Sequence, residues 1–255
     1  MATKSCELDS MPTLLLKKAC PALLRTLTDM VNKSLETGTF PEDFKNARIR
    51  PLLKKPSLDP DVMSNYRPVS NIPFLAQVIE KVVSARLTKY LSSGNLLDPM
   101  QSAYRQYHST ETALSKLHDD VTRAMDHGKG VFIVALDLSA AFDTIDHAIL
   151  LRRLESDFGI GGLALKWLAS YMTGRFQEVT VKGHVSRKVP LHFGVPQGSV
   201  LGPQLFSLYT TPIGHIIRKH LLPNILFADD NNLYIVFDPT NPTEVAHVIQ
   251  KLTGH

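Results

Sequence analysis

Apolar residues recur at helical spacing in several stretches of the chain, and these stretches predict its helices. The clearest stretch follows Pro73 and ends at Gly94 and Asn95, as helices that start after proline and stop at glycine do. Its apolar face consists of Leu75, Val78, Ile79, Val82, Val83, Leu87, Tyr90 and Leu91. Residues 12–35 show the same spacing, but Pro21 interrupts it. We therefore expect two short helices there.

Further helices are predicted from capping residues and glycine breaks. Ser109 has the character of a helix N-cap, and Gly128 would end that helix. The expected buried stripe is Leu114, Leu117, Val121 and Met125. Helices are also expected at 149–154 and 163–172, separated by the glycines of 159–162, and at 203–219.

Strand-like patterns complete the picture. Residues 47–53 predict a strand that enters a basic, proline-punctuated loop at 54–68, and residues 131–136 predict another. Residues 178–182 and 187–193 alternate around Gly183 and His184, which indicates a hairpin. A second hairpin is expected at 225–237. Helices and hairpins around a small sheet make the expected fold class α+β.

Composition narrows the class of protein. A chain of 255 residues that is 44% hydrophobic can form one or two domains. The two cysteines, Cys6 and Cys20, lack metal-type spacing and favour a reducing, intracellular compartment, nuclear or cytoplasmic. Residues 1–11 lack the apolar segment of a signal peptide, and no apolar run is long enough to span a membrane. Residues 45–90 hold nine Lys or Arg against three Asp or Glu, which suits a polyanion such as nucleic acid.

Acidic residues follow two of the predicted strands. Asp137 ends one of them, and Asp229 and Asp230 lie at the centre of the acidic hairpin. An Asp-Asp-Asn-Asn segment alone is explained by a simple turn. If the three acids meet, two carboxylates about 4 Å apart repel by about 4 kcal/mol at an effective dielectric near 20. Divalent cations offset that repulsion, and oxygen ligands of this type suit Mg²⁺. The sequence alone does not show that the acids converge.

Several segments, in order along almost the whole chain, resemble the reverse transcriptases of non-LTR retrotransposons of the LINE type, particularly jockey-like elements. Residues 131–147 (VFIVALDLSAAFDTIDH), 193–209 (FGVPQGSVLGPQLFSLY) and 226–234 (LFADDNNLY) resemble the three palm motifs of that family. Residues 51–74 and 101–110 are similar to its fingers segments, and residues 5–16 to the stretch before them. The resemblance implies a right-hand polymerase fold of fingers and partial palm, with an antiparallel sheet and packed helices.

The same resemblance implies roles for individual residues. Asp137, Asp229 and Asp230 would be catalytic and would hold two Mg²⁺ ions, or Mn²⁺ instead, with the carbonyl of Leu138. The nucleotide-binding residues would be Lys54, Arg67, Arg105, Phe142, Gln197 and Gly198. Among them, Phe142 would be the steric gate against a ribose 2′-hydroxyl. Asp143 and Asp146 are expected to orient or cap the following helix rather than to contact metal.

The resemblance also exposes departures from the family pattern. Phe227 replaces the usual tyrosine, Asn231 and Asn232 replace a commoner Thr-Gln pair, and Tyr107 stands where glycine is frequent. The chain ends eighteen residues after Phe237, and we expect the thumb to be absent. The resemblance then implies part of a longer retroelement protein that also carries an endonuclease and a thumb.

The expected organisation has five segments: an N-terminal helical extension (1–45), fingers (46–130), the first palm motif (131–146), helices and a hairpin (147–194), and the truncated palm with its second and third motifs (195–255). The implied function is RNA-directed DNA polymerisation on an RNA template and a DNA primer with deoxynucleoside triphosphates. Three alternatives stay open: an inactive nucleic-acid-binding remnant, an RNA-dependent RNA polymerase, and a relic without a stable product.

Overall fold

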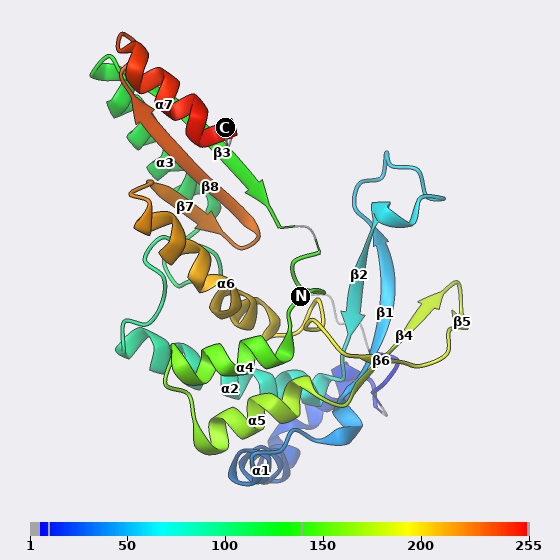
Figure 1. The fold of residues 1–255 in the computed structure, drawn as a ribbon. Helices are drawn as coiled ribbons and strands as arrows, with labels where there is room; N and C mark the ends of the chain where they lie inside the picture. The colour runs from blue at the N-terminus through cyan, green and yellow to red at the C-terminus, as the bar shows by residue number, and fades with distance from the viewer. Residues whose placement is uncertain (1–5, 10, 139, 254–255) are drawn as a thin grey trace. The chain divides into compact units, whose positions relative to one another are not determined.

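The computed structural model describes residues 6–9, 11–138 and 140–253. Two of the segments that resemble the family, residues 5–16 and 131–147, therefore lie in part outside the described residues. Contacts divide the chain into two units, of which unit 1 comprises residues 1–96 and 142–208 and unit 2 comprises residues 97–141 and 209–255. Each unit is α+β, as expected, and both are drawn in Figure 1. The five segment boundaries expected from the sequence remain a prediction.

Unit 1 holds a five-stranded sheet and the helices before and after it. Its strands are β1 (Asn46–Leu53), β2 (Tyr66–Asn71), β4 (Arg175–Val181), β5 (His184–Val185) and β6 (Val189–Leu191). Its helices are α1 (Thr13–Thr37), η1 (Glu42–Phe44), η2 (Met63–Asn65), α2 (Phe74–Ser93), α4 (His147–Ser156), α5 (Gly162–Met172) and the first part of α6 (Gly202–Lys219). The strand order is β2-β1-β4-β5, with β6 also paired to β4.

Three expectations for unit 1 were wrong or incomplete. Residues 13–37 form one helix rather than two, although Pro21 lies inside it. Proline has no N–H to donate to the carbonyl four residues earlier, but Pro21 is exposed, so that carbonyl can bind water instead. The expected basic loop at 54–68 ends in strand β2, which pairs antiparallel with β1. The sheet is also mixed, since β1 and β4 run parallel.

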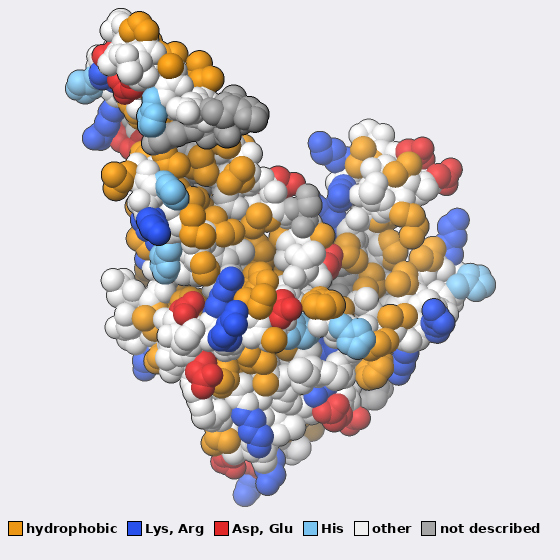
Figure 2. Space-filling model, viewed as in Figure 1, with side chains coloured by type: hydrophobic (Ala, Val, Ile, Leu, Met, Phe, Trp, Pro, Cys, Tyr) orange, Lys and Arg blue, Asp and Glu red, His pale blue; other side chains and the backbone are white. Residues whose placement is uncertain are grey.

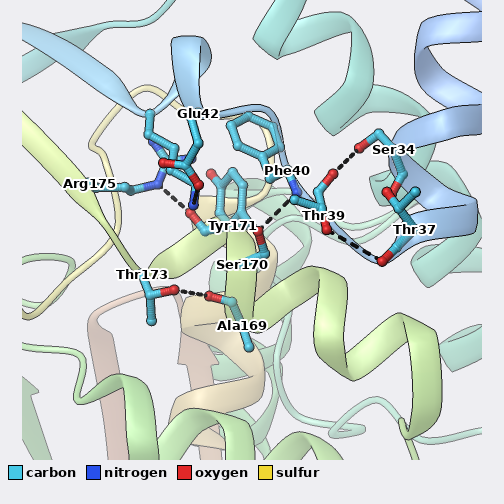
Figure 3. A network of polar contacts seen from close by, with 11 residues as sticks. Ser34, Thr37, Thr39, Phe40, Glu42, Ala169, Ser170, Tyr171, Thr173 and Arg175 are labelled. Atoms are coloured by element: carbon cyan, nitrogen blue, oxygen red, sulfur yellow. Dashed lines mark hydrogen bonds and ion pairs between the residues drawn. The ribbon is translucent and has the colours of Figure 1, made fainter.

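The core of unit 1 contains a cluster of aromatic rings. Phe40 packs edge-on against Trp167 and Tyr171, with ring centroids 5.5 and 5.2 Å apart. Two hydrogen bonds lie at its border (Figure 3): the Phe40 N–H donates to Ser170 Oγ at 3.0 Å, and Arg175 Nε donates to the carbonyl of Tyr171. These contacts anchor α5 to the segment that enters β1.

Unit 2 is built on a three-stranded antiparallel sheet in the order β3-β8-β7. The strands are β3 (Gly130–Asp137), β7 (Asn224–Phe227) and β8 (Asp230–Phe237), and the helices are α3 (Thr110–Asp126), the second part of α6, and α7 (Pro242–Thr253). Helix α3 packs against β3 and β7, and α7 lies against β8. The sequence patterns above did not predict α7, although Asn241 caps it and Pro242 opens it.

Helix α3 confirms one expectation and corrects another. Ser109 forms a reciprocal capping box with Thr112, as its position predicts. The expected buried stripe was partly wrong, because Leu114 and Met125 are exposed and Ala113 is buried instead. The face that meets the sheet is therefore rotated by about one residue. Among the described residues, no helix is both long enough and apolar enough to cross a lipid bilayer.

Candidate active site

Unit 2 brings acidic residues from two distant stretches together. Strand β3 pairs with β8 so that Asp137 lies directly opposite Asp230. Opposed residues in an antiparallel pair project from the same face of the sheet, with Cβ atoms about 4.5–5.5 Å apart. Asp229 lies next to this pair, in the two-residue loop that joins β7 to β8. The register thus supports the convergence that the sequence could only suggest.

The loop that carries Asp229 is tightly held through its backbone. Phe227 pairs with Asp230, and Ala228 between them has a φ of 55°, a left-handed conformation that costs a residue with a Cβ about 1–2 kcal/mol. The Ala228 N–H donates to Oε1 of the buried Gln101 at 3.1 Å. Asn231 Nδ2 donates to the carbonyl of Asp229 at 3.0 Å. Gln101 comes from an expected fingers segment, so that segment supports the acidic loop.

The three carboxylates lack cationic partners among the described residues. Two cations of unit 2 are engaged elsewhere: Arg218 forms a two-point ion pair with Asp98, and Lys129 pairs with Asp238. Tyr104 is affected by one of these acids, because burial and then the charge of Asp229 raise the pKa of its hydroxyl. Negative charge therefore remains uncompensated at this edge of the sheet.

The acids fit a hard divalent cation in part. Asp137 and Asp230 line a hollow of about 270 Å³ together with Thr110 and Asn232. Opposed carboxylates without a counter-charge are oxygen donors of the kind that Mg²⁺ takes. Within the described part of the chain, however, no three His, Cys, Asp or Glu side chains form a group suited to hold a metal ion. The donor chemistry fits, and a closed set of three ligands is not formed.

The β1–β2 hairpin of unit 1 carries two of the expected nucleotide-binding residues. Arg67 lies opposite Leu52, two residues before Lys54. The Lys54 N–H donates to the Asn65 carbonyl at 2.8 Å, which continues the pairing by one residue. Lys54 and Arg67 therefore share one face of the hairpin, and both are exposed. Figure 2 shows blue and red side chains together at this end of the hairpin, so its charge is mixed rather than purely basic.

The remaining expected residues lie in different surroundings. Gln197 and Gly198 form a turn that is held to β2, since the Ser70 N–H donates to the Gln197 carbonyl at 2.8 Å. The half-buried ring of Phe142 stacks on Phe206, with centroids 5.0 Å apart. In unit 2, Arg105 Nη1 donates to the carbonyl of Asp98 at 3.2 Å, which ties its guanidinium to the protein. Their roles toward a nucleotide remain predictions.

The structure also resolves smaller expectations. Asp146 caps α4 by accepting from the Ile149 N–H at 2.9 Å, as predicted. Asp143 does not share that role and instead accepts from Gln197 Nε2 at 2.9 Å. Burial raises the pKa of the Asp143 carboxyl, and the bond from Gln197 opposes that rise. Tyr107 has a φ of 64°, which explains why glycine suits its position, and its side chain is exposed.

Sequence reasoning missed two polar residues near these sites. Glu80, on the apolar face of α2, is fully buried and accepts from the Val200 and Leu201 N–H groups at 2.6 and 3.1 Å. Burial raises the pKa of its carboxyl. Its position within an apolar helical face was the available signal, because a charge there requires a partner. Tyr104 gave no comparable signal, since only the fold brings it near Asp229.

Comparisons with known proteins show which family the chain resembles. Residues 53–253 match the family model of the reverse transcriptase (RNA-dependent DNA polymerase). A probable RNA-directed DNA polymerase from transposon BS of Drosophila melanogaster is 30% identical over 234 residues, which cover 89% of the chain and 25% of that protein. The RNA-directed DNA polymerase from mobile element jockey of the same fly is 29% identical, over 81% of the chain and 23% of that protein.

A solved structure shows the same fold. Apo telomerase from Candida tropicalis superposes with a TM-score of 0.57 at 12% sequence identity, over 91% of the chain and 46% of that protein. The chain spans about a quarter of the length of its retrotransposon relatives.

Proposed function

The chain belongs to the reverse transcriptase (RNA-dependent DNA polymerase) family, and we propose that it forms the fingers and part of the palm of an RNA-directed DNA polymerase from a non-LTR retrotransposon. The proposed reaction adds deoxynucleotides to a DNA 3′-end, copied from an RNA template. The observation that carries the proposal is the register that opposes Asp137 to Asp230 beside Asp229. The likeness to polymerase relatives supports it. Endonuclease and thumb would belong to a longer protein.

The acids of unit 2 would hold the divalent ions. Asp137, Asp229 and Asp230, with the carbonyl of Leu138, are the proposed ligands of two Mg²⁺ ions, for which Mn²⁺ can substitute. Bound ions of this kind supply Lewis acidity to the attacking hydroxyl and offset charge on the departing pyrophosphate. The chain's own contribution is to fix carboxylates on strand ends, where the backbone ladder and Gln101 limit their movement. The uncompensated negative charge supports this assignment.

Unit 1 would contribute contacts to the nucleotide. Lys54 and Arg67 lie on one face of the hairpin, where two cationic side chains suit a triphosphate. Gln197 and Gly198 present an amide and an open backbone from a fixed turn. The ring of Phe142, which stacks on Phe206, is the proposed gate against a ribose 2′-hydroxyl. In unit 2, Arg105 has donors left beyond its bond to Asp98.

Primer extension on an RNA template with Mg²⁺ tests the proposal. Asp229→Asn should lower deoxynucleotide incorporation by about a hundredfold or more, as loss of an electrostatic group at a reacting centre does. Asp126→Asn, an exposed site in the last turn of α3, makes the same change in charge and should leave incorporation unchanged. Equal incorporation by wild type and Asp229→Asn would reject the polymerase assignment.

The same samples separate the polymerase from a binding remnant. Filter binding at increasing salt concentration measures contacts to the nucleic-acid backbone whether or not catalysis occurs. Steep salt dependence without any incorporation would favour the remnant.

Phe142→Ala should relax the preference for deoxynucleotides, and an unchanged preference would remove Phe142 from the gate role.

A further inference from the structure

Two side chains of unit 1 that belong to different sequence motifs form a hydrogen bond with each other. Gln197 Nε2 donates to Asp143 Oδ2 at 2.9 Å. Asp143 directly follows Phe142 in the first palm motif, and Gln197 lies in the turn of the second. The pair lines a hollow of about 400 Å³ that also contains His192 and Pro196. An ionised carboxylate only accepts hydrogen bonds, so it selects the amino end of the amide.

The backbones that carry both side chains are fixed against each other. The Gly194 N–H donates to the Ile145 carbonyl at 2.7 Å, and the Val195 N–H donates to the Phe142 carbonyl at 2.9 Å. Gly194 has a φ of 80°, and a Cβ there would lie 2.8 Å from the Cα of Asp143. On the other side, the Gln197 carbonyl accepts from the Ser70 N–H. The two side chains therefore meet without reorganisation of their backbones.

We propose that Asp143 is a positioning residue that sets the orientation of the Gln197 amide, so that Gln197 presents its carbonyl oxygen to a hydrogen-bond donor on bound nucleic acid. The ligand role of Gln197 rests on the proposed function, whereas the orientation does not. Hydroxyl and exocyclic amino groups are the donors that a nucleotide offers to such an oxygen. The pair would thus select a donor group at this position.

A matched set of variants tests the polarity of the amide. Gln197→Glu alone places two carboxylates side by side and should weaken binding by roughly tenfold. Adding Asp143→Asn supplies an amide that donates to the new carboxylate, whose other oxygen is then left facing the ligand. This double variant has the same net charge as the wild type and should bind within about threefold of it. Asp143→Ala with Gln197→Glu has that charge too, but lacks the orienting donor and should stay weaker.

The probes are decamers of riboadenylate and deoxyriboadenylate, with fluorescence anisotropy as the readout. Rescue seen only with the ribo probe assigns the donor to the 2′-hydroxyl, and equal rescue with both assigns it to the adenine amino group. Either result supports the proposal. If the double variant with Asp143→Asn binds no better than the one with Asp143→Ala, the proposal is overturned.

A second measurement needs no ligand. In a ¹⁵N–¹H spectrum, the side-chain amide protons of Gln197 should differ more in chemical shift in the wild type than in Asp143→Ala, because one of them is bonded to the carboxylate. Identical Gln197 shifts in the two proteins would overturn the orientation. A wild type that binds neither decamer but shows the shift difference would count against the proposed function and not against the orientation. Trp167 fluorescence confirms that each variant is folded, since this tryptophan is buried in unit 1.

Discussion

The turn at residues 196–198 of unit 1 and the acidic loop at residues 228–229 of unit 2 are positioned in different ways. The turn is held by side chains and backbone from several elements: Ser70 of β2 binds its carbonyl, Asp143 binds its glutamine, and Glu80 of α2 binds the two N–H groups that follow. The acidic loop depends mainly on the β7–β8 and β3–β8 ladders, with Gln101 as its main side-chain support.

The two regions also differ in charge. The buried carboxylate of Glu80 binds two N–H groups and lies near Arg175, whose charge favours its ionised form. The carboxylates of Asp137, Asp229 and Asp230 have no cationic partner among the described residues. The carboxylate that serves the fold is bound by N–H groups of the chain, whereas the charge on the strand ends has no cationic partner in the described part of the chain and is available to a ligand.

The largest effect on stability is expected from removing the buried carboxylate that binds the segment after the turn. Glu80→Ala leaves the Val200 and Leu201 N–H groups without their acceptor and should lower the free energy of unfolding by about 3–5 kcal/mol, as breaking a buried charged network does. Urea unfolding followed by Trp167 fluorescence measures unit 1, because Trp167 is the single tryptophan.

Two variants on the same helix control that result. Glu80→Gln keeps an acceptor oxygen and should lose less stability than Glu80→Ala. Lys81→Ala removes an exposed charge and should change the free energy of unfolding by less than about 0.5 kcal/mol. If Glu80→Ala is no less stable than Lys81→Ala, the turn does not depend on the buried carboxylate.

A smaller effect of opposite sign is expected in unit 2. Asp137→Asn removes one of two like charges that oppose each other across β3 and β8, and in the absence of divalent ions it should stabilise the sheet by about 0.2–1 kcal/mol. Amide hydrogen exchange along β3 and β8 measures this change. Added Mg²⁺ should slow amide hydrogen exchange along these strands more in the wild type than in the variant. Equal slowing in both proteins would argue against a metal role for Asp137.

The smallest expected effect is a change in one titration. Burial and then the charge of Asp229 raise the pKa of Tyr104, so Asp229→Asn should lower that pKa while leaving it above the ordinary tyrosine value. The sign follows because a neutral neighbour no longer disfavours the phenolate. NMR of ¹³C-labelled tyrosine measures the titration, with Tyr107, which is exposed, as the internal control. An unchanged Tyr104 would show that the charge at position 229 does not reach it.

Much of this architecture follows from local patterns. The strand before Asp137 and the hairpin around Asp229 were readable because alternating or continuous apolar runs end at acids. Strand β2 was missed because Pro68 and the charged residues before it resemble a loop, and its pairing with β1 is what makes it a strand. The exposure of Leu114 and Met125 could not be predicted either, because the side of α3 that is buried depends on how the helix packs on β3 and β7.

The amino-acid sequence by itself determined the family, most of the helices and strands, and the identity of the acidic residues, because these depend on residue type and spacing along the chain. The tertiary structure alone decided that Asp137 opposes Asp230, that Glu80 caps the segment after the turn, and that Asp143 binds Gln197. Each of those contacts joins residues far apart in the chain, and strand register and packing, which involve many residues at once, set them.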